Sequence, residues 1–122
     1  MGYQTELYEN CWRCNYTSDV SVSDIALVTT EIGARLDRGG PQYILHDFTA
    51  VTNFSDGCAA VLVFSLNGAK GAVAAIEKIA VVSANSQFSY LVNQFAKQRP
   101  SQKIQVFDKL HRAEDWFANL LS

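Results

Sequence analysis

The segment KIAVVSANSQFSYLVNQF, residues 78–95, carries the clearest local signals of the fold. Its first part, Lys78–Val82, is a largely β-branched run bounded by polar residues, which is typical of a buried strand. Asn85 or Ser86 then begins a helix, because either side chain can accept hydrogen bonds from the free N–H groups of the first turn. The apolar residues that follow lie on one helical face: Phe88, Leu91, Val92 and Phe95. A buried strand followed by an amphipathic helix predicts one βα unit of an α/β protein.

The same alternation continues on both sides of this unit. After it come a strand over Lys103–Phe107 and a helix whose apolar face holds Ala113, Trp116, Phe117 and Leu120. Before it come a strand over Tyr43–Asp47, a loop over Phe48–Phe54 and a second helix that starts at Ser55–Gly57. That second helix is expected to run through Ala60, Val61, Phe64 and Leu66.

The N-terminal third predicts a hairpin and a first helix. Alternating residues indicate a strand over Cys11–Thr17, with Thr5–Tyr8 as its antiparallel partner. Ser21 with Asp24 three residues later resembles a capping box. The helix that follows presents Ile25, Val28, Ile32 and Leu36 on one face and ends at the glycines and proline of residues 37–41.

These elements together predict an α/β fold of the mixed-sheet type. We expect about five strands, mostly parallel with an N-terminal antiparallel hairpin, and about four helices. Residues 1–122 are expected to form a single domain, because this length is typical of one domain and too short for two sizeable ones.

Composition excludes several classes of protein. Apolar residues make up 48% of the chain and charged residues 18%, against about 25% charged in an average domain, which excludes intrinsic disorder. A net charge of −2 does not favour a nucleic-acid partner. No signal peptide or transmembrane segment is recognisable, and three cysteines do not form an even disulfide framework. We therefore expect a cytoplasmic protein.

Cys11 and Cys14 form a C-x-x-C pair. A zinc site needs about four ligands and no second pair exists, while a redox pair normally opens a helix rather than lying inside a strand. A separation of three in a strand places the two side chains on opposite faces. We therefore expect a core Cys14 and a surface Cys11, with no metal site.

His46 and Asp47 end a predicted strand, which is where ligands usually bind in α/β sheets. No activated nucleophile, glycine-rich phosphate loop or metal motif accompanies them. We therefore expect no catalytic residues and no cofactor. An enzyme that uses His46, Asp47 and Asp56 as acid and base is the less favoured alternative.

Ser55, Asp56 and Gly57 are expected to open the second helix. Serine is a good N-cap, and an aspartate in the first turn interacts favourably with the helix dipole. The same helix start would also hold a phosphate.

The segment DFTAVTNFSDG, residues 47–57, resembles the signature of STAS domains, the sulfate-transporter and anti-sigma-factor-antagonist family. In that signature a strand ends in Asp and, after a loop, an Asp-Ser-Ser/Gly element opens a helix, its serine being the phosphorylated switch in the antagonists. Residues 78–85 and 104–117 resemble the family's later strands and its last helix. The C-terminal pattern is most similar to the SpoIIAA-like branch, which shades into lipid-carrier CRAL-TRIO-like domains.

The resemblance implies a non-enzymatic regulatory or protein-interaction module. Counting from Asp47, the phosphoacceptor position falls on Asp56, and a shift of one residue would make Ser55 the acceptor. The implied switch or interaction residues are Asp47, Ser55, Asp56 and Gly57. A possible ligand or partner surface comprises His46, Phe54, Cys58, Val61 and Phe64.

Two further expectations concern partners. The second helix is apolar on nearly every side, so we expect it to be deeply buried or covered by a partner, and a homodimer through it is a reasonable expectation. The carrier-type resemblance implies the alternative function, binding of a lipid or small hydrophobic ligand in a cavity or groove beside this helix.

Overall fold

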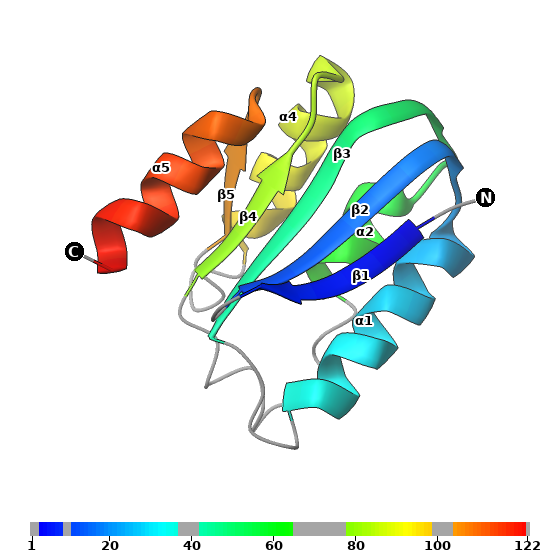
Figure 1. The fold of residues 1–122 in the computed structure, drawn as a ribbon. Helices are drawn as coiled ribbons and strands as arrows, with labels where there is room; N and C mark the ends of the chain where they lie inside the picture. Colours follow the sequence, from blue (N-terminus) through cyan, green and yellow to red (C-terminus); the bar gives the residue numbers. More distant parts are fainter. Residues whose placement is uncertain (1–2, 9–10, 37–41, 65–77, 99–103, 122) are drawn as a thin grey trace.

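The computed structural model describes residues 3–8, 11–36, 42–64, 78–98 and 104–121 of the chain (Figure 1). One five-stranded sheet follows the sequence order, with β1 antiparallel to β2 and the other neighbours parallel. Its strands are β1 (Tyr3–Tyr8), β2 (Cys11–Val20), β3 (Tyr43–Phe54), β4 (Lys78–Val82) and β5 (Ile104–Phe107). The described helices are α1 (Val22–Leu36), α2 (Cys58–Phe64), α4 (Ser86–Ala96) and α5 (Leu110–Leu121). The expected mixed α/β sheet with its N-terminal hairpin is confirmed.

Helices cover both faces of the sheet. α1, α2 and α4 pack on one face over the larger core, and α5 packs alone among the described helices on the other (Figure 1). Ile44 of β3 and Val81 of β4 face the larger core, whereas Leu45 and Val82 face α5. Burial on both faces explains why the central strands are continuously apolar. None of the described helices is long and apolar enough to cross a membrane.

Two helix starts follow the predicted side-chain caps. The Ser21 hydroxyl oxygen accepts a hydrogen bond from the Asp24 N–H (3.2 Å), and an Asp24 carboxylate oxygen accepts one from the Ser21 N–H (2.9 Å). This reciprocal pair is the expected capping box at α1. At α4 the cap is Asn85, whose side-chain oxygen accepts from the Phe88 N–H (2.9 Å).

The predicted loop over Phe48–Phe54 is wrong, because these residues continue β3. They pair in parallel with the second half of β2, which runs on to Val20. Two register shifts give β3 two more residues than β2 over the paired stretch, since Asn15–Val20 pairs with Asp47–Phe54. The extra residues are β-bulges, and they space the inward side chains Phe48, Val51 and Phe54 three apart instead of two. The apolar residues in this half of β3 therefore do not recur at every second position, which is the spacing by which a strand is recognised in a sequence.

The cysteines lie as the strand pattern predicts. Cys14 is buried in the larger core, and Cys11 is half-buried against the α5 side. Neither forms a disulfide. Burial, partly offset by the charge of Arg13, raises the pKa of the Cys11 thiol to about 11, and burial raises the pKa of Cys14 still further.

Candidate functional site

The turn between β3 and α2 is fixed to the start of α1. The Ser55 N–H donates to the carbonyl of Val20 (2.9 Å), and the Ser55 hydroxyl oxygen accepts from the Val22 N–H (3.2 Å). The expectation that Ser55 caps the second helix is therefore wrong, because its side chain satisfies a free N–H group of α1. The parallel pairing of β2 with β3 brings the ends of both strands together, so the helices that follow them start side by side.

Gly57 gives this turn its shape. Its φ of +88° lies in the left-handed region, where a side chain causes strain. The Gly57 carbonyl accepts the Val61 N–H (3.0 Å), and α2 follows at once. Asp56, directly before it, is exposed and makes no hydrogen bond or ion pair with any residue that the structure describes. The turn therefore holds an exposed carboxylate with which no described residue pairs.

Cys58 is the first residue of α2, and its side chain lies in the interior. Its sulfur lies 3.4 Å from the Ser55 hydroxyl oxygen and 3.5 Å from the carbonyl oxygen of Val20. Cys58 is only 2% exposed. These polar contacts hold the buried side of the turn in place, whereas Ser55, Asp56 and Gly57 are exposed to solvent.

A cleft of about 300 Å³ lies between this turn and α4. Phe54 stacks on Phe88 in its lining, with ring centroids 4.0 Å apart. Cys58 also lines the cleft, whereas Val61 and Phe64, which were predicted to share a surface with it, do not. The remaining lining is partly polar and partly apolar: Asn53, Ser55, Asp56, Gly57, Ala59, Ala60, Asn85, Gln87, Leu91 and Phe95.

Sequence reasoning missed the contribution of α4 to this cleft. Phe88, Leu91 and Phe95 share the helical face that the periodicity predicted, but nothing local indicated that this face borders the turn before α2. Phe64, the last residue of α2, also contacts α4, where its ring packs edge-on against Phe95 with centroids 5.4 Å apart. The contact between two helices from successive βα units is what builds the cleft.

His46 does not contribute to a surface, contrary to expectation. It is 2% exposed, and its Nδ1 lies 3.0 Å from the hydroxyl of Tyr16. Burial lowers the pKa of His46 to about 4, so the ring is neutral near pH 7. A neutral, enclosed imidazole with an aromatic partner is a core group.

Asp47 is separated from the turn that it was expected to join. Its carboxylate accepts hydrogen bonds from the N–H (2.9 Å) and the hydroxyl (2.6 Å) of Thr49. It pairs with Val82, where β4 ends, while β3 runs on for seven residues to Phe54, about 20 Å along the strand. His46, Asp47 and Asp56 therefore do not converge on one pocket as acid–base chemistry requires.

The apolar character of α2 is explained largely within the monomer. Cys58, Ala59, Leu62 and Val63 are buried, and the helix packs against both α1 and α4. Val61 and Phe64 are half-buried and pack against the same core.

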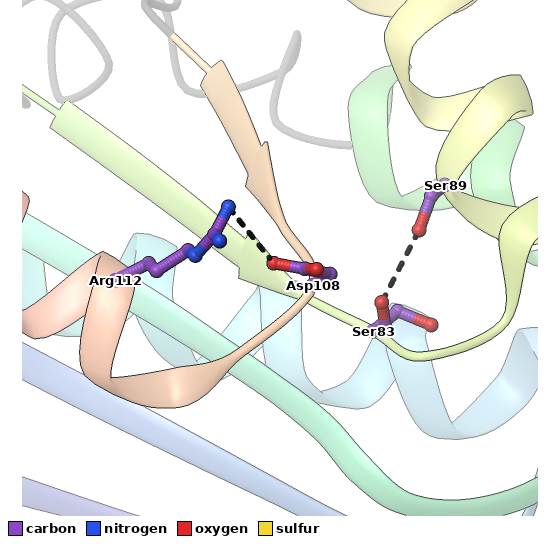
Figure 2. Close-up of polar contacts among 4 residues, drawn as sticks. All are labelled: Ser83, Ser89, Asp108 and Arg112. Carbon is purple, nitrogen blue, oxygen red and sulfur yellow. Dashed lines mark hydrogen bonds and ion pairs between the residues drawn. The ribbon is translucent and has the colours of Figure 1, made fainter.

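Polar contacts link the carboxyl ends of β4 and β5 to each other and to the helices that follow them (Figure 2). The Ser83 N–H donates to the carbonyl of Phe107 (3.0 Å), and the Ser89 hydroxyl donates to the carbonyl of Ser83 (3.5 Å). Arg112 forms an ion pair with Asp108 (3.6 Å). Among the described residues, no group of three or more His, Cys, Asp or Glu side chains could hold a metal ion.

Comparison with known proteins identifies the fold of the chain. No protein-family model and no curated protein sequence matches the chain. Solved structures do match. The phosphorylated form of the Bacillus cell-fate determinant SpoIIAA has a TM-score of 0.65 at 10% identity, covering 95% of this chain and 99% of that one. An anti-sigma factor antagonist from Mycobacterium paratuberculosis gives 0.60 at 13% identity, with 93% and 91% covered.

A third match lacks an assigned function. It is an uncharacterized protein of the DUF3478 family from Shewanella loihica PV-4, described as having a SpoIIAA-like fold, with a TM-score of 0.59 at 14% identity and 94% and 91% of the two chains covered. The chain therefore has the SpoIIAA-like α/β fold that the sequence resemblance implied. Identities this low establish the fold alone.

Proposed function

We propose that this chain is a non-enzymatic regulatory module that binds a protein partner through the turn at the start of α2. One observation carries the proposal: the Asp56 carboxylate is exposed, pairs with no residue that the structure describes, and lies in a turn held by hydrogen bonds to β2 and α1. Two of the solved structures that share the fold are named an anti-sigma factor antagonist and a cell-fate determinant in its phosphorylated form, which supports a regulatory role.

The proposal assigns Asp56 a permanent charge where the resembled family carries a switchable serine. A carboxylate supplies one negative charge, against about 1.5 to 2 for a phosphate group at pH 7. Ser55 is the less suitable acceptor, because its hydroxyl already contacts the Val22 N–H and the Cys58 sulfur. We therefore infer that partner binding at this turn is constitutive.

The test is a partner-binding measurement with a charge reversal at the turn. The tagged chain is used to isolate a partner from its source cells, and the affinity of the purified partner is then measured by titration calorimetry. Asp56→Lys is expected to weaken binding by about tenfold or more, because a reversed charge opposes a complementary partner surface. Asp115→Lys is the matched control, since Asp115 is exposed on α5, across the sheet.

Equal affinities for the two variants would contradict the proposed contact surface. Failure to isolate any partner with the wild-type chain would count against the interaction module as a whole. Incubation with ATP and source-cell extract should leave Ser55 without added phosphate by mass spectrometry. A phosphorylated Ser55 would show that the switch has been retained.

The cleft beside α2 supports a second candidate function, binding of a small hydrophobic ligand. Its stacked Phe54 and Phe88 rings provide an apolar surface, and about 300 Å³ is at the lower end of ligand pockets. This favours a small apolar group rather than a long lipid. Native mass spectrometry of freshly purified protein should then show a bound small molecule that Phe54→Ala loses, while a ligand-free wild-type spectrum would contradict this function.

We also propose a cytoplasmic location. Cys11, Cys14 and Cys58 are all free, which suits a reducing compartment. Fractionation of source cells should recover the protein with cytoplasmic markers, and recovery from a secreted fraction would contradict the proposal.

A further inference from the structure

The outer edge of β5 is open in the part of the chain that the structure describes. β5 is the last strand of the sheet, and β4 is its neighbour on the inner side. The Phe107 carbonyl accepts the Ser83 N–H, so the main-chain polar groups of Phe107 face inward. Because these groups alternate along a strand, those of Ile104 and Val106 face outward. No described strand pairs with them, which leaves them available to a further strand.

A groove runs along this open edge between two helices. Its volume is about 470 Å³, and its walls come from α4 on one side and α5 on the other. Figure 2 shows Ser89 of α4 and Arg112 of α5 on either side of the chain as it leaves β5. Asn93 lies one turn after Ser89 on α4 and continues the polar wall. The lining thus combines a strand edge with side chains that form hydrogen bonds.

The groove lining holds one cation, Arg112, and one acid, Asp108, and two exposed lysines follow lining residues in the chain. These are Lys97, which follows Asn93 on α4, and Lys109, which follows Asp108 after β5. The one acidic residue of the lining, Asp108, pairs with Arg112 at 3.6 Å, and both side chains are 61% exposed. Such an exposed pair contributes little stability, so a second carboxylate can compete for the guanidinium at little cost.

We infer that the β5 edge binds an extended acidic segment of a partner protein, which adds to the sheet as a sixth strand. The main-chain groups of Val106 supply sequence-independent hydrogen bonds, and the cations select acidic side chains. This surface is separate from the proposed contact at Asp56, because α4 presents Phe88 and Leu91 to the cleft beside α2 but Ser89 and Asn93 to the β5 groove. Either site can therefore fail its test without affecting the other.

The first test removes one main-chain donor. A fluorescein-labelled peptide, Thr-Glu-Val-Glu-Thr-Glu-Val-Glu, serves as the probe, and binding is measured by fluorescence anisotropy. Val106→Pro deletes the outward N–H, a change that edge strands can accommodate. Val106→Ala is the matched control, because it loses the same half-buried side chain and keeps the donor. We expect the probe to bind the wild type and Val106→Ala, and to bind Val106→Pro about tenfold more weakly.

The second test changes charge and leaves the strand intact. Arg112→Glu should weaken probe binding, whereas Asp108→Asn should strengthen it by releasing Arg112 and removing a repulsive carboxylate. A peptide with lysine in place of glutamate should not bind. These surface variants keep the inference falsifiable if Val106→Pro fails to fold, which circular dichroism will show.

Several outcomes would overturn the inference. The probe could fail to bind the wild type, or the lysine peptide could bind equally well. The affinity of Arg112→Glu for the probe could be unchanged. In an NMR titration with the probe, the chemical-shift changes could be confined to residues of the α2 cleft. Concentration-dependent dimerisation that Val106→Pro abolishes would also overturn it, because a second copy of the chain would then occupy the edge.

Discussion

The hydroxyl oxygen of Tyr16 and Nδ1 of His46 lie 3.0 Å apart and share a hydrogen bond inside the larger core. The Tyr16 ring also stacks on Phe48, with centroids 4.3 Å apart. Burial raises the pKa of Tyr16 well above its ordinary value and lowers the pKa of His46 to about 4. Both groups are therefore neutral near pH 7, and the pair contributes to folding only in that form.

Acid should destabilise the protein through His46. Its folded-state pKa of about 4 lies below the unfolded value of 6.5, so the unfolded chain binds the proton first and stability falls as pH drops from 6.5 towards 4. The loss attributable to this group reaches about 3 kcal/mol at pH 4. Urea unfolding of the wild type and His46→Asn across this range will measure it as a difference, since carboxylates affect both proteins alike. Parallel stability curves would contradict the burial of a titratable ring.

Substitution of Gly57 should destabilise the turn through backbone strain rather than through a clash. An added Cβ would lie 3.5 Å from Val22 Cγ2, an ordinary contact, but φ is +88°. Gly57→Ala should therefore lower the free energy of unfolding by about 1–2 kcal/mol. Gly57→Asn should cost less, because asparagine tolerates this region better. Thermal unfolding of both variants tests the order, and an alanine variant as stable as the wild type would show that the turn relaxes.

The thiols should differ in reactivity. With its pKa raised to about 11, only about one Cys11 in a thousand is thiolate at pH 8, so its alkylation should be slow. Cys14 and Cys58, each at most 2% exposed, should react only when the protein unfolds. Peptide mass spectrometry after iodoacetamide treatment, with and without urea, measures this. A disulfide between Cys11 and Cys14 under mild oxidation would contradict their placement on opposite faces.

Phe48 should be among the most sensitive core positions. Its ring is 1% exposed and contacts the rings of Tyr16, Phe54 and Phe88. Phe48→Ala should cost about 3–5 kcal/mol, through lost burial and the cavity that it leaves. Tyr90→Ala, at a residue 61% exposed, should change stability by about 0.5 kcal/mol or less. Chemical denaturation distinguishes the two, and similar small losses would place Phe48 outside the core.

Local patterns predicted most of the secondary structure. The Ser21–Asp24 capping box, the Asn85 cap and the run Lys78–Val82 each depend on neighbours only a few residues apart, so the sequence alone shows them. The second half of β3 could not be predicted in this way. Its inward residues Phe48 and Val51 are three apart, because bulges interrupt the alternation that identifies a strand.

The site depended on contacts between distant parts of the chain. The Ser55 hydroxyl oxygen accepts a hydrogen bond from the N–H of Val22, thirty-three residues earlier. This bond forms only because β2 and β3 pair along their whole second halves. His46 is similarly buried by Tyr16, thirty residues away. The sequence predicted a helix start at Ser55–Gly57, where the structure has the turn directly before α2. It also grouped Asp47 with these residues, since a strand end at Asp47 was expected.

The bulges of β3 have a consequence for sequence alignment. They fall after Asp47 and before Asn53, and each adds a residue to β3 while β2 keeps its own count. A relative that lacks one bulge would preserve the same turn with one residue fewer between the aspartate and the serine. Alignment gaps therefore belong inside this strand, where gaps are normally forbidden. Whether Ser55 or Asp56 is equivalent to a relative's serine should be decided by superposing the turns, not by counting from Asp47.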